Sequence, residues 1–255
     1  MHTHCLKEVK KMANVKDFYD YLNTIAPFDT QESWDNSGML VGDMSAKVHK
    51  AAVTLDITVK EIEKAREIGA DLIISHHPVI FSPIKAVTSG SVPYELVKSG
   101  INALCCHTPL DIADGGTNDS LAEILGIEVT RAEDPILRLG TVEKTTADKL
   151  ASHIADRLGT TVRYADAGKP ITKVAICTGS GCSLIEASGD IDAFITGDAS
   201  HHNFLDCVQS GITLIASGHY ETEIVAVPVL VKKLQGQFPD IEIIDIKQEN
   251  PIKFA

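Results

Sequence analysis

Residues 50–77 read KAAVTLDITVKEIEKAREIGADLIISHH, and this stretch contains the signals of a strand, a helix and a second strand. The apolar run KAAVTLD predicts the first strand. In the segment that follows, Thr58 and Glu61 have the spacing of a capping box, and Gly69 marks the end of a helix. DLIIS then predicts another buried strand. Because two strands joined by a helix pair in parallel through a right-handed crossover, the stretch predicts an α/β fold.

The alternation of strands and helices continues beyond this stretch. Residues 92–100 predict a short helix with a proline near its start and a glycine at its end, and residues 101–106 predict a third strand. A helix follows, which we expect to be capped by Asp119 or Ser120 and closed by Gly126. These elements predict a doubly wound α/β lobe in the first half of the chain.

The second half of the chain repeats the plan of the first. Residues 173–198 read KVAICTGSGCSLIEASGDIDAFITGD, in which Asp192 opens an apolar strand as Asp71 does in the first copy. We therefore expect two related α/β lobes, residues 12–130 and residues 131–255, with mostly parallel sheets flanked by helices. Ligands of such sheets gather beyond the carboxyl ends of the strands, so a binding cleft is expected there.

The composition is that of an ordinary globular chain, and it argues against some classes of protein. Of the 255 residues, 44% are hydrophobic and 23% are charged, and the formal net charge is −12. Because phosphate backbones bind to basic surfaces, this charge makes nucleic acid an unlikely main partner. The six cysteines form no C-x-x-C pair, which favours reduced thiols and a cytoplasmic location over a disulfide framework.

The amino-terminal segment does not resemble a secretory signal, because MHTHCLKEVKKM has lysines without an apolar core region. We expect residues 1–11 to be a ragged extension and the folded chain to begin near Met12 with an amphipathic helix. His2 and His4 are therefore not counted as ligands. No apolar run approaches the roughly 18 residues of a membrane span, so no membrane association is expected.

Histidines gather just beyond the predicted strands. Six of the ten histidines lie there, and they are His76, His77, His107, His201, His202 and His219. Two carboxylates accompany them, because Asp111 and Glu223 each follow a histidine at the spacing of one helical turn. Imidazoles and carboxylates are metal ligands, so we expect a metal cleft at the carboxyl ends of the strands.

Each of these residues also has an ordinary structural interpretation. A histidine at a strand end is often a hydrogen-bonded surface residue, His107 could cap a turn, and Asp111 could belong to an Asx turn. His219 and Glu223 could be a surface pair on a helix. The adjacent pair after DLIIS is better explained by function, because the second copy has a glycine and an aspartate in its place. The loop CTGSG is either a tight turn or a phosphate cradle at a helix N-terminus.

Four motifs, in order and over nearly the whole chain from Met12, resemble those of a known family. They are SHHPVIFSPIK, HTPLDIADGGTND, ITGD and GHYETE, and SWDNSGMLVGD near the start also matches. On these motifs the chain resembles the YbgI-like dinuclear-metal family, whose members are described as GTP cyclohydrolase type 2 homologues. The segment between Arg131 and Lys173 has no room for the domain that some members insert, so the chain resembles the short form.

The resemblance implies a two-lobed α/β fold, a ring-shaped homohexamer and two bound metal ions. It also implies five metal ligands, which are His76, His77, Asp111, His219 and Glu223. The segment GDASHHNFLD resembles a variant of the family that has a histidine pair after Gly-Asp. Because metal sites of this kind rarely need so many imidazole ligands, we expect His201 and His202 to be a solvated pair or to support the ligands from outside.

Adjacent histidines that face opposite sides of a strand chelate one ion poorly but are suited to serving two ions. We infer that His76 and His77 bind different metals, with Asp111 or Glu223 as the bridging carboxylate. Mixed imidazole and carboxylate ligands suit Zn, Mn or Fe. His107 and His202 are then candidates for supporting the ligands or for acid–base chemistry on a substrate.

Two functions remain open. The first is a metal-dependent hydrolase that acts on a small, nucleotide-type substrate through a metal-bridging hydroxide, with Glu223 and His107 as catalytic residues. This hydrolase would open a purine ring or cleave a phosphoester. The alternative is a non-catalytic metal carrier or a regulatory ring-shaped scaffold that binds a protein partner. A cavity of substrate size above the metals favours the first, and a sealed, fully coordinated pair of ions favours the second.

Overall fold

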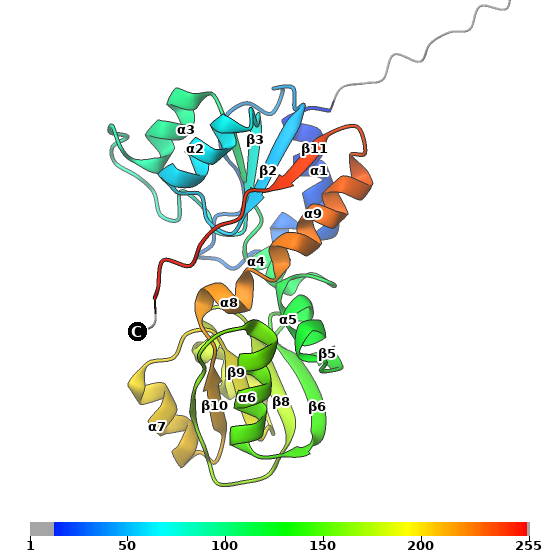
Figure 1. The fold of residues 1–255 in the computed structure, drawn as a ribbon, viewed down its shortest axis with the longest axis vertical. Helices are drawn as coiled ribbons and strands as arrows, with labels where there is room; N and C mark the ends of the chain where they lie inside the picture. Colours follow the sequence, from blue (N-terminus) through cyan, green and yellow to red (C-terminus); the bar gives the residue numbers. More distant parts are fainter. Residues whose placement is uncertain (1–12, 254–255) are drawn as a thin grey trace, which may run out of the picture.

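The computed structural model describes residues 13–253, whose strands form two sheets (Figure 1). Met12 and the expected extension before it lie outside the described residues. The first sheet has the order β1-β4-β3-β2-β11, with β1 (Gly38–Val41), β2 (Lys50–Thr54), β3 (Leu72–Ser75), β4 (Asn102–Cys105) and β11 (Glu242–Asp245). The second has the order β5-β6-β8-β9-β10-β7, with β5 (Val129–Arg131), β6 (Arg138–Thr145), β7 (Arg163–Ala165), β8 (Ile171–Cys177), β9 (Ala193–Thr196) and β10 (Thr213–Ala216).

The first sheet is mostly parallel, as predicted. Strands β11, β2, β3 and β4 pair in parallel, and only β1 is antiparallel to its neighbour β4. Alternate residues of β3 enter different cores: Leu72 and Ile74 pack on α1 (Val15–Ile25) and α9 (Ala226–Gln237), whereas Ile73 packs on α2 (Val59–Glu67) and α3 (Val92–Ser99). The strands are apolar on both faces because helices cover both faces of the sheet.

The second sheet is mixed, which differs from the mostly parallel sheet that we expected. Strands β8, β9 and β10 are parallel, but β5, β6 and β7 each pair with a neighbour in the antiparallel sense. Residues 132–137 alone connect β5 to β6, and so short a link allows a hairpin but no helical crossover. Helices α5 (Thr117–Leu125) and α6 (Ala147–Leu158) cover one face, while α7 (His201–Gln209) and the 3-10 turns η2 (Gly181–Leu184) and η3 (Glu186–Ser188) cover the other. A third 3-10 turn, η1 (Phe28–Thr30), follows α1.

Helix α5 begins at Thr117, before the cap that was predicted at Asp119 or Ser120. The Asp119 carboxylate is engaged elsewhere, because it accepts a hydrogen bond from the Gly115 amide at 2.7 Å and pairs with the buried guanidinium of Arg138. The end of the helix agrees with the prediction, since Gly126 adopts a positive φ of 69°.

The internal repeat has a structural counterpart in two aspartates. Asp71 Oδ2 accepts hydrogen bonds from the amides of His49 at 2.7 Å and Lys50 at 3.2 Å. In the second lobe Asp192 Oδ2 accepts from the amides of Thr172 and Lys173, both at 2.8 Å. Each carboxylate therefore ties the start of its own strand to the start of the neighbouring strand, β3 to β2 in one lobe and β9 to β8 in the other.

The two lobes exchange their last helices. After β4 the chain forms α4 (Thr108–Ile112) between the lobes and continues into α5, which packs on the second sheet through Leu121, Ala122 and Leu125 (Figure 1). After β10 it forms α8 (His219–Glu223) and continues into α9, which packs on the first sheet through Ala226, Val227, Leu230 and Leu234. Strand β11 then pairs with β2, so the sheets do not divide the chain at residue 130 as the expected boundary did.

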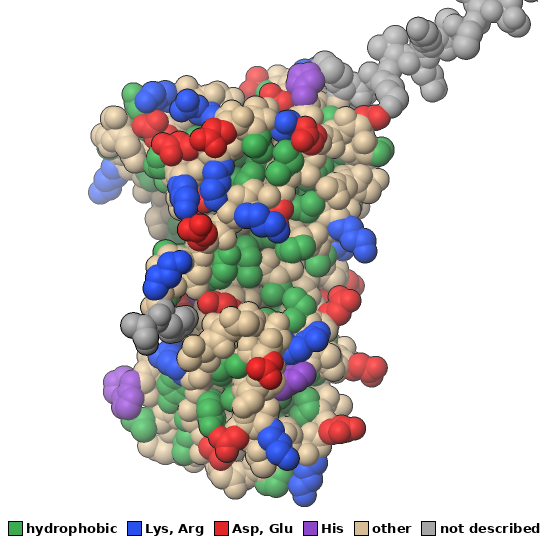
Figure 2. Space-filling view, in the orientation of Figure 1, with side chains coloured by type: hydrophobic (Ala, Val, Ile, Leu, Met, Phe, Trp, Pro, Cys, Tyr) green, Lys and Arg blue, Asp and Glu red, His purple; other side chains and the backbone are tan. Residues whose placement is uncertain are grey.

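The surface carries acidic and basic side chains side by side. On the face drawn in Figure 2, lysines and arginines lie among aspartates and glutamates on both lobes. Within the described part of the chain, no helix has the length and apolar character that crossing a membrane requires. All five cysteines in this part are free thiols.

Candidate metal centre

His76 and His77 follow β3 directly, and both rings turn toward the space between the lobes. Strand β3 ends at Ser75, where the His76 and His77 amides both donate to the Leu55 carbonyl at 3.1 and 3.0 Å. The strand does not continue, so its alternation no longer sends the two side chains to opposite faces. Instead the rings lie 5.0 Å apart, centroid to centroid, and His76 is only 2% exposed.

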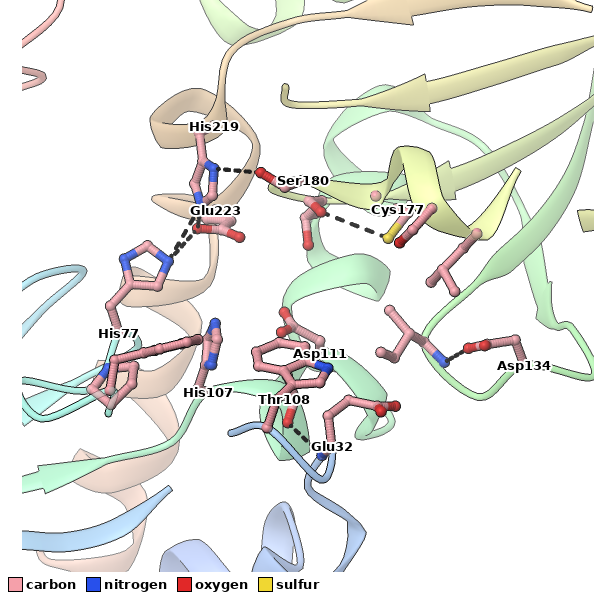
Figure 3. A pocket seen from close by; sticks show the side chains of 18 residues that line it. Glu32, His77, His107, Thr108, Asp111, Asp134, Cys177, Ser180, His219 and Glu223 are labelled. Atoms are coloured by element: carbon pink, nitrogen blue, oxygen red, sulfur yellow. Dashed lines mark hydrogen bonds and ion pairs between the residues drawn. The ribbon is translucent and has the colours of Figure 1, made fainter. Parts of the chain in front are cut away.

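Helix α8 brings the second lobe to these histidines. His219 and Glu223 lie on one face of the helix, as their spacing predicted, with His219 Nε2 3.0 Å from Glu223 Oε2. The same carboxylate oxygen lies 2.8 Å from His77 Nε2, and the Nε2 atoms of His77 and His219 are 3.4 Å apart (Figure 3). These three residues are close enough to ligate one metal ion together.

Helix α4 brings a second carboxylate to the other side of the cluster. Asp111 Oδ1 lies 3.6 Å from His76 Nε2, and Glu223 Oε1 lies 3.9 Å from the same nitrogen. The two oxygens of Glu223 therefore face different imidazoles. All five residues that the family resemblance implied as ligands come together here, from the loop after β3 and from the two helices α4 and α8.

A carbonyl or carboxylate oxygen holds the Nδ1 atom of every imidazole in the cluster. His76 Nδ1 contacts the Cys106 carbonyl at 3.0 Å, His77 Nδ1 contacts Asp56 at 2.7 Å, His219 Nδ1 contacts Asp198 at 2.7 Å, and His107 Nδ1 contacts Asp35 at 2.8 Å. An oxygen at Nδ1 fixes the ring and leaves Nε2 as the free nitrogen. Histidines that bind metals are usually held in this way.

The buried polar atoms of the cluster fit a cation. Among the described residues, His76 Nε2 and Asp111 Oδ1 are buried without a hydrogen-bond partner. Burial opposes protonation of His77 and His219, but hydrogen bonds to carboxylates outweigh it and raise the pKa of His77 to about 10 and that of His219 to about 9. For a carboxyl group, burial acts in the opposite direction and raises the pKa, as it does for Asp111. Burial would also raise the pKa of Glu223, but the surrounding imidazoles hold it well below its usual range. The same carboxylates that favour a proton on these imidazoles would also favour a divalent cation between them, and such a cation would displace the protons.

His107 completes a second group of possible ligands, with His76 and His77. Its ring centroid lies 5.1 Å from that of His76 and 5.4 Å from that of His77. It also lines a cavity of about 470 Å³ between the lobes, which the two groups of ligands border on one side (Figure 3). The cluster is therefore open to a small molecule.

Asp35 and Asp56 are the functional residues that the sequence analysis missed. Asp56 lies two residues after the end of β2, so the rule that singled out the other strand ends would also have found it. Asp35 belongs to the SWDNSGMLVGD motif, and besides His107 it accepts a hydrogen bond from the Thr108 amide at 3.1 Å. Its partners His107 and Thr108 are more than 70 positions away in sequence, and no local pattern links them to Asp35.

His202 does not reach this cavity. It is exposed in the first turn of α7 beside His201, with the two ring centroids 5.9 Å apart. The structure therefore gives no support to an acid–base role for His202. The residue of this segment that does contact the cluster is Asp198, through His219.

The CTGSG loop is built as a tight support and not as a phosphate cradle. Three of its amides are already used inside the protein: those of Thr178, Gly179 and Gly181 donate to Asn118 Oδ1 at 2.8 Å, Thr222 Oγ1 at 3.1 Å and Thr196 Oγ1 at 3.1 Å. Gly179 has a φ of +61°, and a Cβ atom at this position would lie 2.1 Å from Glu223 Oε1. The glycine therefore allows the loop to pass directly against the cluster.

A two-lobed α/β fold with a histidine–carboxylate cluster between the lobes defines the class of this protein. The family model Duf34/NIF3 (NGG1p interacting factor 3) matches residues 13–251, and the chain belongs to this family. A Campylobacter jejuni protein named "GTP cyclohydrolase 1 type 2 homolog" is 32% identical over 94% of this chain and 99% of its own length. A Clostridium perfringens protein of the same name is also 32% identical over the same shares.

Solved structures have the same fold. A hypothetical protein from Staphylococcus aureus aligns with a TM-score of 0.88 and 26% identity, over 96% of this chain and all of the other. Protein ybgI, whose title states an unknown function, aligns with a TM-score of 0.85 and 26% identity, over 94% of this chain and all of the other. The resemblance to the YbgI-like family that was read from the motifs is thereby confirmed.

Proposed function

We propose that the protein is a metal-dependent hydrolase with a dinuclear centre, acting on a small molecule of the nucleotide type. The observation that carries this proposal is the position of Glu223. Its Oε2 faces His77 and His219, and its Oε1 faces His76, which Asp111 also approaches. One carboxylate with an imidazole group at each oxygen is suited to bridging two ions, and the ligand set suits Zn, Mn or Fe.

Residues around the centre have separate parts in this proposal. Bound divalent ions would supply Lewis acidity toward a substrate oxygen and would acidify water. Glu223 and Asp111 would balance the charge of the ions and keep their positions. His107, held at Nδ1 by Asp35, presents its Nε2 for a proton transfer to or from a substrate in the cavity.

The alternative is a metal carrier or a regulatory ring-shaped scaffold. The open cavity beside the cluster supports the hydrolase over the carrier, because a carrier has no need for a space of substrate size. We also propose the hexameric ring that the family resemblance implied. Light scattering of the eluted protein should then give about six times the chain mass of 27.4 kDa, and a monomer that binds metal would contradict the ring.

The decisive experiment joins metal analysis to a turnover screen. Protein purified without chelator should contain two ions per chain, and Glu223→Gln should contain fewer, while the exposed His202→Ala should match the wild type. Wild type loaded with Mn or Zn should release formate or phosphate from one member of a panel of nucleotides, nucleosides and bases. Metal binding without turnover above the Glu223→Gln background would replace the hydrolase with the carrier, and absence of metal would remove both.

A further inference from the structure

Two exposed aromatic rings stand at the cavity. Trp34, the only tryptophan of the chain, is 53% exposed, and Phe81 is 50% exposed. Their ring centroids are 5.7 Å apart with an interplanar angle of 32°, and both rings approach His107 edge-on at 5.8 and 6.2 Å. Large rings are usually buried in a fold of this size, so two that line a cavity beside candidate catalytic groups indicate a surface for a ligand.

The segments that carry these rings are fixed in place. Asp35 follows Trp34 and is held by His107, by the Thr108 amide and by the Ser37 hydroxyl at 3.0 Å. Asn36 Nδ2 donates to the Ile80 carbonyl at 2.6 Å, and this bond joins the segment of Trp34 to that of Phe81. The aromatic pair is therefore organised before a ligand binds, which lowers the entropy that binding costs.

The charges around the cavity select against a polyphosphate. Apart from Asp111 and Glu223, whose charge the proposed ions would offset, the described lining contains the carboxylates of Glu32 and Asp134 and no lysine or arginine. In the neighbouring CTGSG loop, the amides of Thr178, Gly179 and Gly181 already donate to side chains of the protein and are not free to bind a phosphate. Phosphate recognition usually depends on such cations and free amides.

We propose that the cavity binds an uncharged heteroaromatic compound, a nucleoside or its free base, in preference to a nucleoside triphosphate. The ring of the ligand stacks on Trp34 and Phe81, and its N–H groups donate to the carboxylates of Glu32 and Asp134. This inference rests on the proposed function and narrows the substrate class of that same site. The metal cluster then lies within reach of the stacked ring.

Because Trp34 is the sole tryptophan, its fluorescence reports on this site alone. Guanosine and adenosine are titrated into the zinc-loaded protein, with GTP, ATP and ribose 5-phosphate as comparisons. We expect saturable quenching by at least one nucleoside, at a concentration at least tenfold below that of its triphosphate, and no quenching by ribose 5-phosphate. Tighter binding of the triphosphates, or no quenching by either nucleoside, would overturn the inference.

Two sets of variants test the contributions of aromatic stacking and of carboxylate charge to binding separately. Phe81→Ala keeps the fluorophore and should weaken nucleoside binding about tenfold, as expected for the loss of one stacking partner. Leu205→Ala removes a comparably exposed apolar side chain on α7, outside the cavity, and should leave binding unchanged. The double variant Glu32→Gln, Asp134→Asn should weaken the nucleoside and strengthen the triphosphate. An unchanged ratio of the two affinities would refute the role of the carboxylates.

The binding readout is independent of catalysis. A nucleoside that quenches Trp34 but is never converted would uphold this inference and remove the hydrolase. Conversely, turnover of a triphosphate by a protein that binds no nucleoside would uphold the hydrolase and remove this inference. Calorimetry on Trp34→Phe and Trp34→Ala completes the test, because the phenylalanine should retain more of the affinity than the alanine.

Discussion

The chemistry of the cluster depends on how each imidazole is oriented. The four rings all turn Nδ1 toward an oxygen of the protein, and the oxygens come from segments far apart in the chain. A ring whose Nδ1 is bound cannot rotate without losing that bond, so its Nε2 stays in place whether or not an ion is present. The residues that hold the rings should therefore affect metal affinity almost as strongly as the ligands do.

Asp56 tests this dependence. Asp56→Ala removes the carboxylate that holds His77 Nδ1 at 2.7 Å, without removing a ligand. We expect zinc affinity, measured by competition with a chromophoric chelator, to fall about 10- to 100-fold. Asp206→Ala, an exposed position on α7, is the control and should bind zinc as the wild type does. Equal affinities for the two variants would show that Asp56 does not support the site.

Gly179 tests the close approach of the CTGSG loop. Gly179→Ala places a methyl group against Glu223 at a positive φ of 61°, whereas Gly168→Ala places one in open space at a φ of 72°. Both should lose about 1 kcal/mol of unfolding free energy, because each strains the backbone. Only Gly179→Ala should also lose bound metal in elemental analysis. Full metal content in this variant would mean that the loop can move away from Glu223.

At the scale of elements, the features that can be predicted from the sequence are those set by a local pattern of residues. The strand–helix–strand unit of residues 50–75 and the face shared by His219 and Glu223 follow from patterns within a few residues. The pairing of β11 with β2 could not be predicted in this way, since it joins residues almost 200 positions apart and nothing in either strand selects the other. The convergence of His76 and His77 depends on where β3 ends, and strand ends are the least predictable part of an element.

The contribution of Asp192, one of the two repeated aspartates, to the unfolding free energy should depend on pH. The amides of Lys173 and Thr172 lower the pKa of its carboxyl, so the native state favours the ionised form. A group with a depressed folded pKa stabilises the protein above its unfolded pKa, and this contribution is lost as the pH falls. The difference in unfolding free energy between wild type and Asp192→Asn should therefore be largest near pH 7 and shrink toward pH 3.

The matched control for Asp192 is Asp206→Asn, made at an exposed position of α7. Urea unfolding followed by circular dichroism at several pH values measures both variants. A difference for Asp192→Asn that stays constant from pH 7 to pH 3 would show that its carboxylate is not what joins β8 and β9.

The whole molecule is held together by the exchange of α5 and α9. The core under α1 is completed by Leu230 and Leu234 of α9, and the core under α6 is completed by Leu121 and Leu125 of α5. Neither sheet keeps both of its apolar faces covered if the chain is cut between the lobes. The candidate metal ligands also come from both lobes, so the cluster exists only when the two are assembled.

Cutting the chain at the boundary expected from the sequence tests this interdependence. A fragment of residues 13–130 lacks α9 and β11, and we expect it to be degraded rapidly by protease and to show no cooperative thermal transition. Co-expression with residues 131–253 should restore a stable complex of the two fragments that binds metal. A first fragment that melts cooperatively by itself would establish residue 130 as a true domain boundary.

Each lobe lends a helix to the other, α5 in one direction and α9 in the other. The single chain therefore resembles a domain-swapped dimer whose two subunits have been fused. In such a dimer each subunit donates the same element to its neighbour and receives the same element back. Here the donated element leaves its lobe through the short helix that carries Asp111 in one case and Glu223 in the other. The two short helices that connect the lobes thus also carry the carboxylates of the candidate metal site. A sequence change that alters either connection would therefore also change the distance between these carboxylates.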